Sequence, residues 1–190
     1  MERSLKIKKV TGLAIFTGLV VCLQLFSNYI TFGAVSITLA LIPIAVGAIL
    51  YGPFAGLFLG LVCGILTFVA PSTISTFWPL GVFKTLVVCL LKMGAAGFVA
   101  GLIYKTLNKK NQNIATILTS ISVPLINTGL FALCSYLLFN DFLVSLAGGE
   151  NTLSYLLFSF IGVNFLFEFV INSFLSPAVL RLVNIIKSND

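Results

Sequence analysis

The stretch Tyr155–Lys187, YLLFSFIGVNFLFEFVINSFLSPAVLRLVNIIK, decides the fold because it is long and apolar enough to cross a membrane. Inside it, Asn164, Glu168 and Asn172 recur every four residues, a spacing that places them on one stripe of a helix. An acid between two amides near mid-bilayer must face protein, water or a ligand, since contact with lipid would be costly. This stripe is therefore the first candidate for a binding surface.

The composition of the whole chain indicates an integral membrane protein. Of its 190 residues, 59% are hydrophobic and 8% are charged, too few charges for a soluble domain of this size. The net charge of +6 comes from residues that flank apolar segments, so it indicates lipid headgroups and membrane topology rather than nucleic acid. The four cysteines lie singly in apolar runs and predict neither a disulfide nor a metal framework.

Six apolar segments predict an all-α fold, a single bundle of six transmembrane helices formed by residues 1–190. A cleaved signal peptide is the alternative for the first segment, but its length and the lack of a clear cleavage site favour a retained helix. Pro43 predicts a kink or a late start of the second helix. The segments run approximately over residues 10–27, 37–50, 54–70, 80–104, 114–139 and 155–187, and loops are expected at 28–36, 71–79 and 140–152.

The distribution of lysine and arginine predicts the topology. The cations precede the first helix, lie between the fourth and fifth, and end the sixth, whereas the three loops just named contain none. Because positive charges are retained on the inner side, both termini are expected in the cytoplasm of a multi-pass plasma-membrane protein. The clusters are Arg3, Lys6, Lys8 and Lys9, then Lys105, Lys109 and Lys110, and finally Arg181 and Lys187.

Small residues at four-residue spacing predict close helix contacts. Gly52, Gly56, Gly60 and Gly64 form a smooth ridge on the third helix, which is most simply explained by packing against a neighbouring helix. Ala14 and Gly18 form a similar pair on the first helix. That pair is consistent with packing inside the fold or with docking to a partner subunit.

Three ionisable residues remain inside the predicted helices, Lys84, Lys92 and Glu168. Lys92 and Glu168 are expected at matched depth, where a structural ion pair and contact with a ligand are equally open interpretations. Lys84 lies in the outer part of its helix and could extend to the headgroups. Asn127 and Asn164 could join helices by amide hydrogen bonds or bind a small polar metabolite.

Motifs for covalent chemistry are missing from the sequence. Gly81–Thr85 superficially resembles a phosphate loop, but Phe83 stands where that loop needs a glycine before its lysine. The chain contains no histidine, no nucleophile elbow, no metal-ligand cluster and no close carboxylate pair. We therefore expect a protein that binds or moves a molecule, that is not an enzyme, that needs no cofactor or metal, and that cannot use ATP by itself.

Three stretches resemble the S components of energy-coupling factor (ECF) vitamin transporters. The first is Ser36–Gly56, SITLALIPIAVGAILYGPFAG, together with the glycine-ridged helix that follows it. The others are Pro124–Phe131, PLINTGLF, and the part of the last helix from Asn164 to Arg181. Each motif alone is weak, but together they cover nearly the whole chain, and the length and the six spans agree.

The resemblance implies a bacterial substrate-binding subunit that captures a water-soluble vitamin from outside. It would work with a transmembrane coupling subunit and two ATPase subunits. Asn28–Ser36 would form a lid, and Ala14 and Gly18 would dock the coupling subunit, with glycine at a position where alanine is usual. The residues that would contact substrate are Tyr29, Trp78, Lys84, Lys92, Asn127, Asn164 and Glu168.

The substrate is left open among cobalamin, pantothenate and a B6-type vitamin. Neutral residues before the second helix disfavour riboflavin, and Leu41 and Ile42 precede Pro43 where pantothenate carriers often show a histidine. Two other classes of function compete with this interpretation. A self-sufficient secondary transporter could use Glu168 as its proton carrier, and a structural membrane protein would need no binding pocket.

Overall fold

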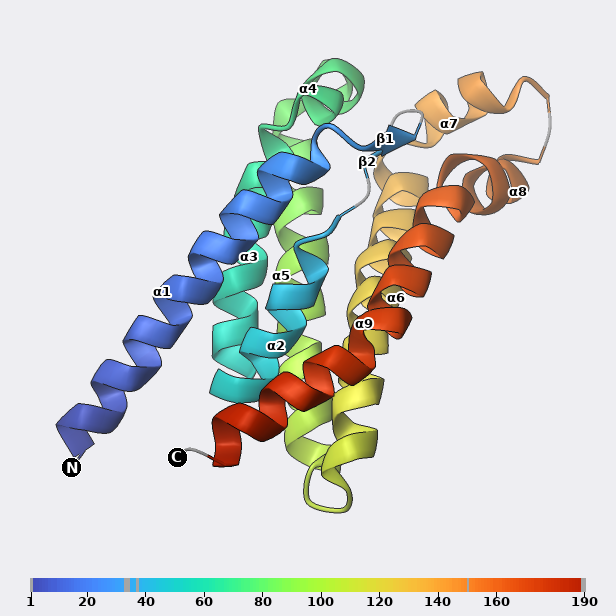
Figure 1. Cartoon of the computed structure of the whole chain (residues 1–190). Helices are drawn as coiled ribbons and strands as arrows, with labels where there is room; N and C mark the ends of the chain where they lie inside the picture. The colour runs from blue at the N-terminus through green and yellow to red at the C-terminus, as the bar shows by residue number, and fades with distance from the viewer. Residues whose placement is uncertain (1, 33–34, 37, 150, 189–190) are drawn as a thin grey trace.

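The computed structural model describes residues 2–32, 35–36, 38–149 and 151–188, which form a bundle of long helices with short helices at one end (Figure 1). A two-residue antiparallel pairing, Thr31 with Ser36 and Phe32 with Val35, makes a hairpin after the first helix. The elements are α1 (Glu2–Ser27), β1 (Thr31–Phe32), β2 (Val35–Ser36), α2 (Leu41–Tyr51), α3 (Pro53–Phe68), α4 (Pro71–Phe77), η1 (Trp78–Leu80), α5 (Val82–Leu107), α6 (Gln112–Leu138), α7 (Asn140–Ala147), α8 (Thr152–Ser154), η2 (Tyr155–Phe160) and α9 (Gly162–Ser188).

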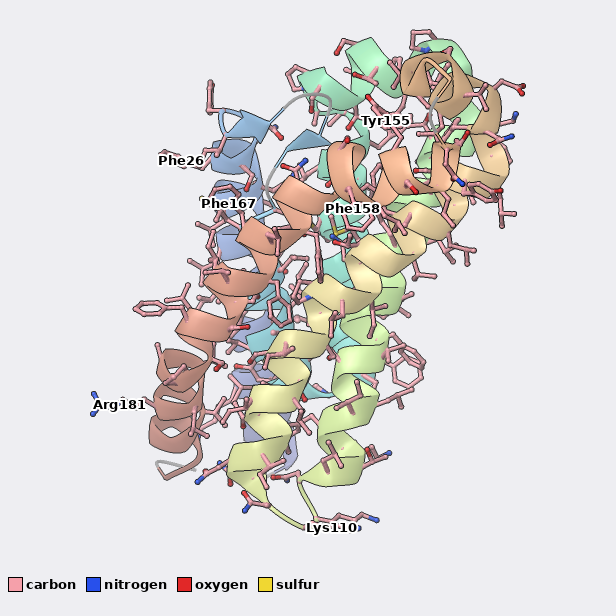
Figure 2. All side chains as sticks on the ribbon, turned by 90° about the vertical axis from the view of Figure 1, so that its right-hand side faces the viewer. Phe26, Lys110, Tyr155, Phe158, Phe167 and Arg181 are labelled. Atoms are coloured by element: carbon pink, nitrogen blue, oxygen red, sulfur yellow. The ribbon has the colours of Figure 1, made fainter. Side chains whose placement is uncertain are left out.

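The lengths and composition of these helices confirm an α-helical, multi-pass membrane protein. Within the described residues, three helices are long and apolar enough to cross a membrane alone, and the number rises to five when each of two bent helix pairs is counted as one span. Large apolar side chains face outward, including Phe158, Phe167 and Phe26 (Figure 2). The one predicted span left out of this count is the second, 37–50, which corresponds to α2; its 11 residues extend roughly 16 Å, about half of the hydrocarbon thickness.

Helix α2 lies in the centre of the bundle. It begins at Leu41, two residues before Pro43, so the late start predicted from this proline is confirmed. Its side chains are buried on nearly every side, and it contacts α1, α3, α5, α6 and α9. A helix that is apolar all round and surrounded by other helices is a core element rather than a lipid-facing one.

The glycine ridge of α3 packs against α5, as its spacing predicts. A Cβ atom at Gly56 would collide with the carbonyl oxygen of Gly97, and a Cβ atom at Gly97 would collide with that of Gly56. Gly60 and Gly64 meet the carbonyls of Met93 and Cys89 in the same way. The two backbones can approach this closely only because glycine has no side chain at these positions.

Two of the segments predicted as loops, 71–79 and 140–152, are largely helical, so that prediction is wrong for them. Residues 71–80 form α4 and η1, and residues 140–147 form α7. Their polar composition suggested loops, but tertiary packing stabilises the helices. Phe77 at the end of α4 contacts the rings of Phe131, Phe139 and Phe142 at centroid distances of 5.8, 5.5 and 6.4 Å.

The predicted continuous helix over 155–187 is also wrong, because the chain breaks near its start. Tyr155–Phe160 forms a π-helical turn, and α9 begins after Ile161. A Cβ atom at Gly162 would lie 2.7 Å from the Leu157 carbonyl oxygen, so this close backbone approach needs glycine. The break turns the first residues of α9 toward the interior of the bundle, where Ile161 and Asn164 are buried.

The two ends of the bundle differ in structure and in charge. The start of α1, the end of α9 and the turn between α5 and α6 lie at one end, and the hairpin, α4 and α7 lie at the other (Figure 1). Lys110 and Arg181 lie toward the first of these ends, whereas Tyr155 lies toward the second (Figure 2). The cationic segments therefore share one end of the molecule, as the charge pattern predicts.

Candidate functional site

The polar stripe of α9 is buried in the bundle. Asn164, Glu168 and Asn172 are 4%, 5% and 3% exposed. The amide of Asn172 donates a hydrogen bond of 2.8 Å to the backbone carbonyl of Glu168, one turn earlier in the same helix. Asn172 is therefore satisfied locally, whereas Asn164 and Glu168 line a cavity.

Glu168 joins three elements of the fold. Its Oε1 accepts a hydrogen bond of 2.8 Å from the backbone N–H of Thr38, in the segment between β2 and α2. Its Oε2 accepts a longer hydrogen bond of 3.5 Å from Nδ2 of Asn127 on α6. Through the first of these hydrogen bonds, Glu168 ties the chain entering α2 to α9.

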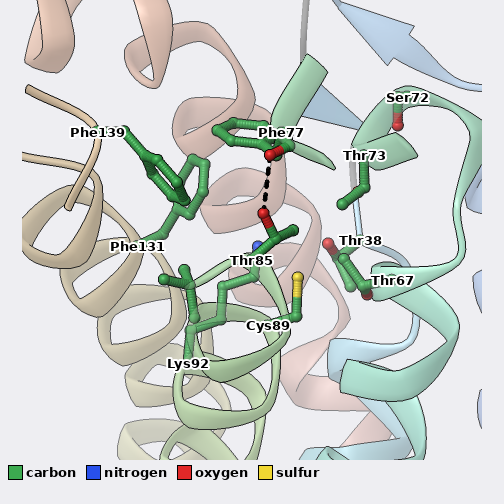
Figure 3. Close-up of a pocket in the computed structure, with 11 residues that line it drawn as sticks. Thr38, Thr67, Ser72, Thr73, Phe77, Thr85, Cys89, Lys92, Phe131 and Phe139 are labelled. Atoms are coloured by element: carbon green, nitrogen blue, oxygen red, sulfur yellow. Dashed lines mark hydrogen bonds between the residues drawn. The ribbon is translucent and has the colours of Figure 1, made fainter. Parts of the chain in front are cut away.

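Two adjoining cavities are built around these side chains. The amide chamber is lined by Thr38, Lys92, Asn127, Thr128, Phe131, Ile161, Asn164, Phe165 and Glu168. The hydroxyl chamber is lined by Thr38, Thr67, Ser72, Thr73, Phe77, Thr85, Val88, Cys89, Lys92, Phe131 and Phe139 (Figure 3). Three residues line both chambers, namely Thr38, Lys92 and Phe131.

Lys92 lies at the junction of the two chambers. It is 7% exposed, and its Nζ lies 4.3 Å from the centroid of the Phe131 ring. Figure 3 shows Lys92 extending from α5, with Phe131 and Phe139 on one side and Thr38 and Thr67 on the other. The direct ion pair with Glu168 considered from the sequence is not formed between these two described side chains.

The hydroxyl chamber contains side chains with different hydrogen-bonding states. The Thr85 hydroxyl donates to the Phe77 carbonyl at 2.9 Å (Figure 3), and the Thr67 hydroxyl donates to the Cys63 carbonyl at 2.9 Å. These two oxygens can therefore act toward a ligand only as acceptors. The hydroxyls of Ser72 and Thr73 have no hydrogen-bond partner within the described part of the chain and can still donate.

Four of the residues predicted to contact substrate are gathered at this site, Lys92, Asn127, Asn164 and Glu168. The other three lie elsewhere. Trp78 donates its indole N–H to the Phe68 carbonyl at 3.1 Å, and its ring lies 5.1 Å from that of Phe68. The lining of the two chambers does not include it or Lys84 and Tyr29, which are both exposed.

The predicted lid, 28–36, contains the β1–β2 hairpin. Gly33 and Ala34 at its tip lie outside the described residues. The hairpin is at the same end of the bundle as α4, which supplies Ser72 and Thr73 to the hydroxyl chamber (Figure 1). The segment just beyond the hairpin is tied to the site by Thr38, which lines both chambers and donates its backbone N–H to Glu168.

The predicted docking pair lies on the surface of α1. Ala14 and Gly18 are both exposed, and a Cβ atom built on Gly18 would meet no atom within 4 Å. In contrast, a Cβ atom at Gly12 on the same helix would collide with the ring of Tyr51. The Gly18 face of α1 therefore offers a close approach to another helix.

Sequence reasoning missed several residues that line the hydroxyl chamber, including Thr67, Thr73, Thr85 and Phe131. Phe131 lies four residues after Asn127 on α6, so the spacing that identified the α9 stripe could also have found it. The threonines carry no comparable signal. A threonine in a membrane helix commonly bonds a carbonyl of its own preceding turn, as Thr67 does, whether or not a ligand is near.

The chain is similar to known transport proteins over its full length. The family model for "ECF transporter, substrate-specific component" matches residues 8–180. The pantothenic acid transporter PanT of Lactococcus lactis subsp. cremoris is 27% identical over 206 aligned positions that cover 100% of both chains. The matched family consists of transporter components and not of enzymes. The chain therefore belongs to the family of substrate-specific components of ECF transporters.

Proposed function

We propose that this chain is the substrate-specificity subunit of an ECF-type importer and that it captures pantothenate or a closely related vitamin from outside the cell. The observation that carries the proposal is a pair of buried polar chambers inside an otherwise apolar bundle of this family. Small-molecule sites commonly combine apolar walls with a few convergent polar groups. Here Phe77, Phe131 and Phe139 form the wall, and Lys92 and Glu168 are the charged groups.

Pantothenate is preferred among the candidate vitamins for two reasons. The relative that matches over the full length is named for it. Its carboxylate would also complement the charge of Lys92, whereas a B6-type vitamin such as pyridoxine brings no anionic group to this lysine.

The residues before Pro43 weigh little against this choice. Leu41, which stands near the position where a histidine would favour pantothenate, is fully buried in the apolar core with Ile44 and Ala45. The lining of the two chambers contains neither Leu41 nor Ile42. A difference at these positions therefore leaves the chemistry of the chambers unchanged.

We further propose a single domain, 1–190, that crosses the plasma membrane six times with both termini in the cytoplasm. The second crossing would combine α2 with the segment that precedes it, sheltered from lipid by the surrounding helices. The cationic end of the bundle would then face inward. The hairpin and α4 lie at the opposite end, so the hydroxyl chamber would be reached from outside.

The energy for transport would come from partners. A transmembrane coupling subunit would pack on α1 at Ala14 and Gly18, where small residues permit close helix contact. Two ATPase subunits would supply ATP hydrolysis, for which this chain has no phosphate loop.

Binding and transport can be tested separately. The purified chain in lipid nanodiscs should bind pantothenate by calorimetry, and native mass spectrometry of gently purified protein should detect a co-purified small molecule. In liposomes the chain alone should not accumulate the vitamin, and adding the coupling module with ATP should permit uptake. Proton-driven uptake by the chain alone would refute the proposal in favour of a secondary transporter. Failure to bind pantothenate, pyridoxine and cobalamin alike would favour a structural protein.

A further inference from the structure

Lys92 is a buried cation that lies against an aromatic ring and forms no ion pair within the described part of the chain. Its Nζ lies 4.3 Å from the Phe131 centroid, and no carboxylate among the described residues forms an ion pair with it. A buried ammonium group without an anionic partner is costly, and a ring face offsets only part of that cost. Glu168 lines the amide chamber together with Lys92, but its own hydrogen bonds go to Thr38 and Asn127.

The groups around Lys92 divide the site into a donor side and an acceptor side. In the hydroxyl chamber, the donors with no hydrogen-bond acceptor among the described residues include the Lys92 ammonium and the hydroxyls of Ser72 and Thr73. In the amide chamber, the Glu168 carboxylate is an acceptor, and Oδ1 of Asn127 is buried with no hydrogen-bond partner. The carboxyl oxygens of Glu168 and the amide oxygen of Asn127 are acceptors, so a ligand in the amide chamber would have to present hydroxyl or N–H donors to them.

We infer that Lys92 is the specificity-determining anchor for a carboxylate on the substrate, with the hydroxyl or amide donors of the same substrate directed to Asn127 and Glu168. This assignment rests on the proposed function and deepens it, because it fixes the substrate class as a monocarboxylate that carries hydrogen-bond donors away from its carboxylate. Pantothenate has this pattern, with a carboxylate at one end and two hydroxyls at the other. The carbon between its hydroxyls carries two methyl groups, which suit the apolar lining of the amide chamber at Phe131, Ile161 and Phe165.

The test compares pantothenate with pantothenol, the neutral alcohol that replaces the carboxylate of pantothenate and leaves the rest unchanged. Calorimetry on the full chain in nanodiscs should show that the wild type prefers pantothenate by about tenfold to a hundredfold, the value of a charge-assisted hydrogen bond. In Lys92→Met this preference should fall to near one, mainly through loss of pantothenate affinity. Lys105→Met, an exposed lysine on the same helix at the other end of the bundle, is the matched control and should keep the preference.

Each outcome separates this inference from the proposed function. Wild-type protein that binds neither compound would overturn the substrate assignment itself. Wild-type protein that binds both equally well would overturn the carboxylate anchor and leave the proposed function in place, and this measurement does not depend on any variant folding. A Lys92→Met protein that retains the preference for pantothenate would overturn the role of Lys92.

Discussion

The backbone N–H of Thr38 donates a hydrogen bond of 2.8 Å to Oε1 of Glu168, which ties the segment entering α2 to the middle of α9. The two residues are 130 positions apart in the sequence, and both line the amide chamber. Thr38 follows the hairpin proposed as the lid by two residues. Glu168 therefore links the lining of the amide chamber to the segment that follows the hairpin.

Substitutions at Glu168 should separate these two effects. Glu168→Gln replaces one carboxyl oxygen with an amide NH2 group but keeps an oxygen that can accept from Thr38, so vitamin binding should weaken while the segment entering α2 stays protected from hydrogen exchange. Glu168→Ala leaves the Thr38 N–H without its acceptor, a loss of about 1–3 kcal/mol. Hydrogen exchange near Thr38 should therefore be faster in the alanine variant only. Equal exchange in both variants would contradict the role of this hydrogen bond.

Asn127 should contribute to binding more than to folding. Asn127→Ala removes the buried Oδ1 acceptor and the amide that donates to Glu168. Pantothenate affinity, measured by calorimetry, should fall by about tenfold, corresponding to about 1.4 kcal/mol. Asn113→Ala, an exposed asparagine in the first turn of the same helix, is the control and should bind as the wild type does. Wild-type affinity in the Asn127 variant would remove this side chain from the site.

The α3–α5 contact should be intolerant of a single added methyl group. Gly56→Ala places a Cβ against the Gly97 carbonyl, and relieving the collision should cost about 1–3 kcal/mol of unfolding free energy. Denaturation of the detergent-solubilised protein by sodium dodecyl sulfate measures this loss. Gly129→Ala on α6 is the matched control, because an added Cβ there meets nothing within 4 Å. A Gly56 variant as stable as the control would mean that the ridge packs less closely than described.

The open face of α1 should matter for assembly and not for binding. Gly18→Leu fills the space next to Ala14, so association with the coupling subunit should weaken by at least about tenfold while pantothenate affinity is retained. Co-purification with the coupling module and calorimetry on the isolated chain measure the two effects. Gly129→Leu tests whether a bulky residue on a different exposed surface has the same consequence. Equal loss of association in both variants would argue against a docking surface on α1.

Trp78 should report on the site although it does not line either chamber. It is the only tryptophan of the chain, and it lies one residue beyond α4, which carries Thr73 and Phe77 of the hydroxyl chamber. Any movement of α4 on binding should change the stacking of its ring on Phe68 and hence its fluorescence. Emission that stays constant at a ligand concentration shown to be saturating by calorimetry would mean that α4 is fixed during binding.

The sequence by itself determined the class of the protein and most of its long helices. Low charge and long apolar runs predicted a helical membrane protein, and the ends predicted near Ser27 and Phe139 agree with α1 and α6. The spacing of Gly56 and Gly60 predicted a close helix contact, which the packing on α5 confirms. These features could be read because hydropathy and four-residue periodicity depend on residues that are neighbours along the chain.

Only the tertiary structure decided which polar groups share a chamber. Glu168 accepts a hydrogen bond from Thr38 and forms no ion pair with Lys92. This choice of partner depends on how α5, α9 and the segment before α2 are rotated and packed, which the local periodicity of the sequence does not record. The break before Gly162 and the short helix α4 have the same origin, since contacts between distant segments stabilise both. The α9 stripe was visible in the sequence, and its partners were set by packing across the bundle.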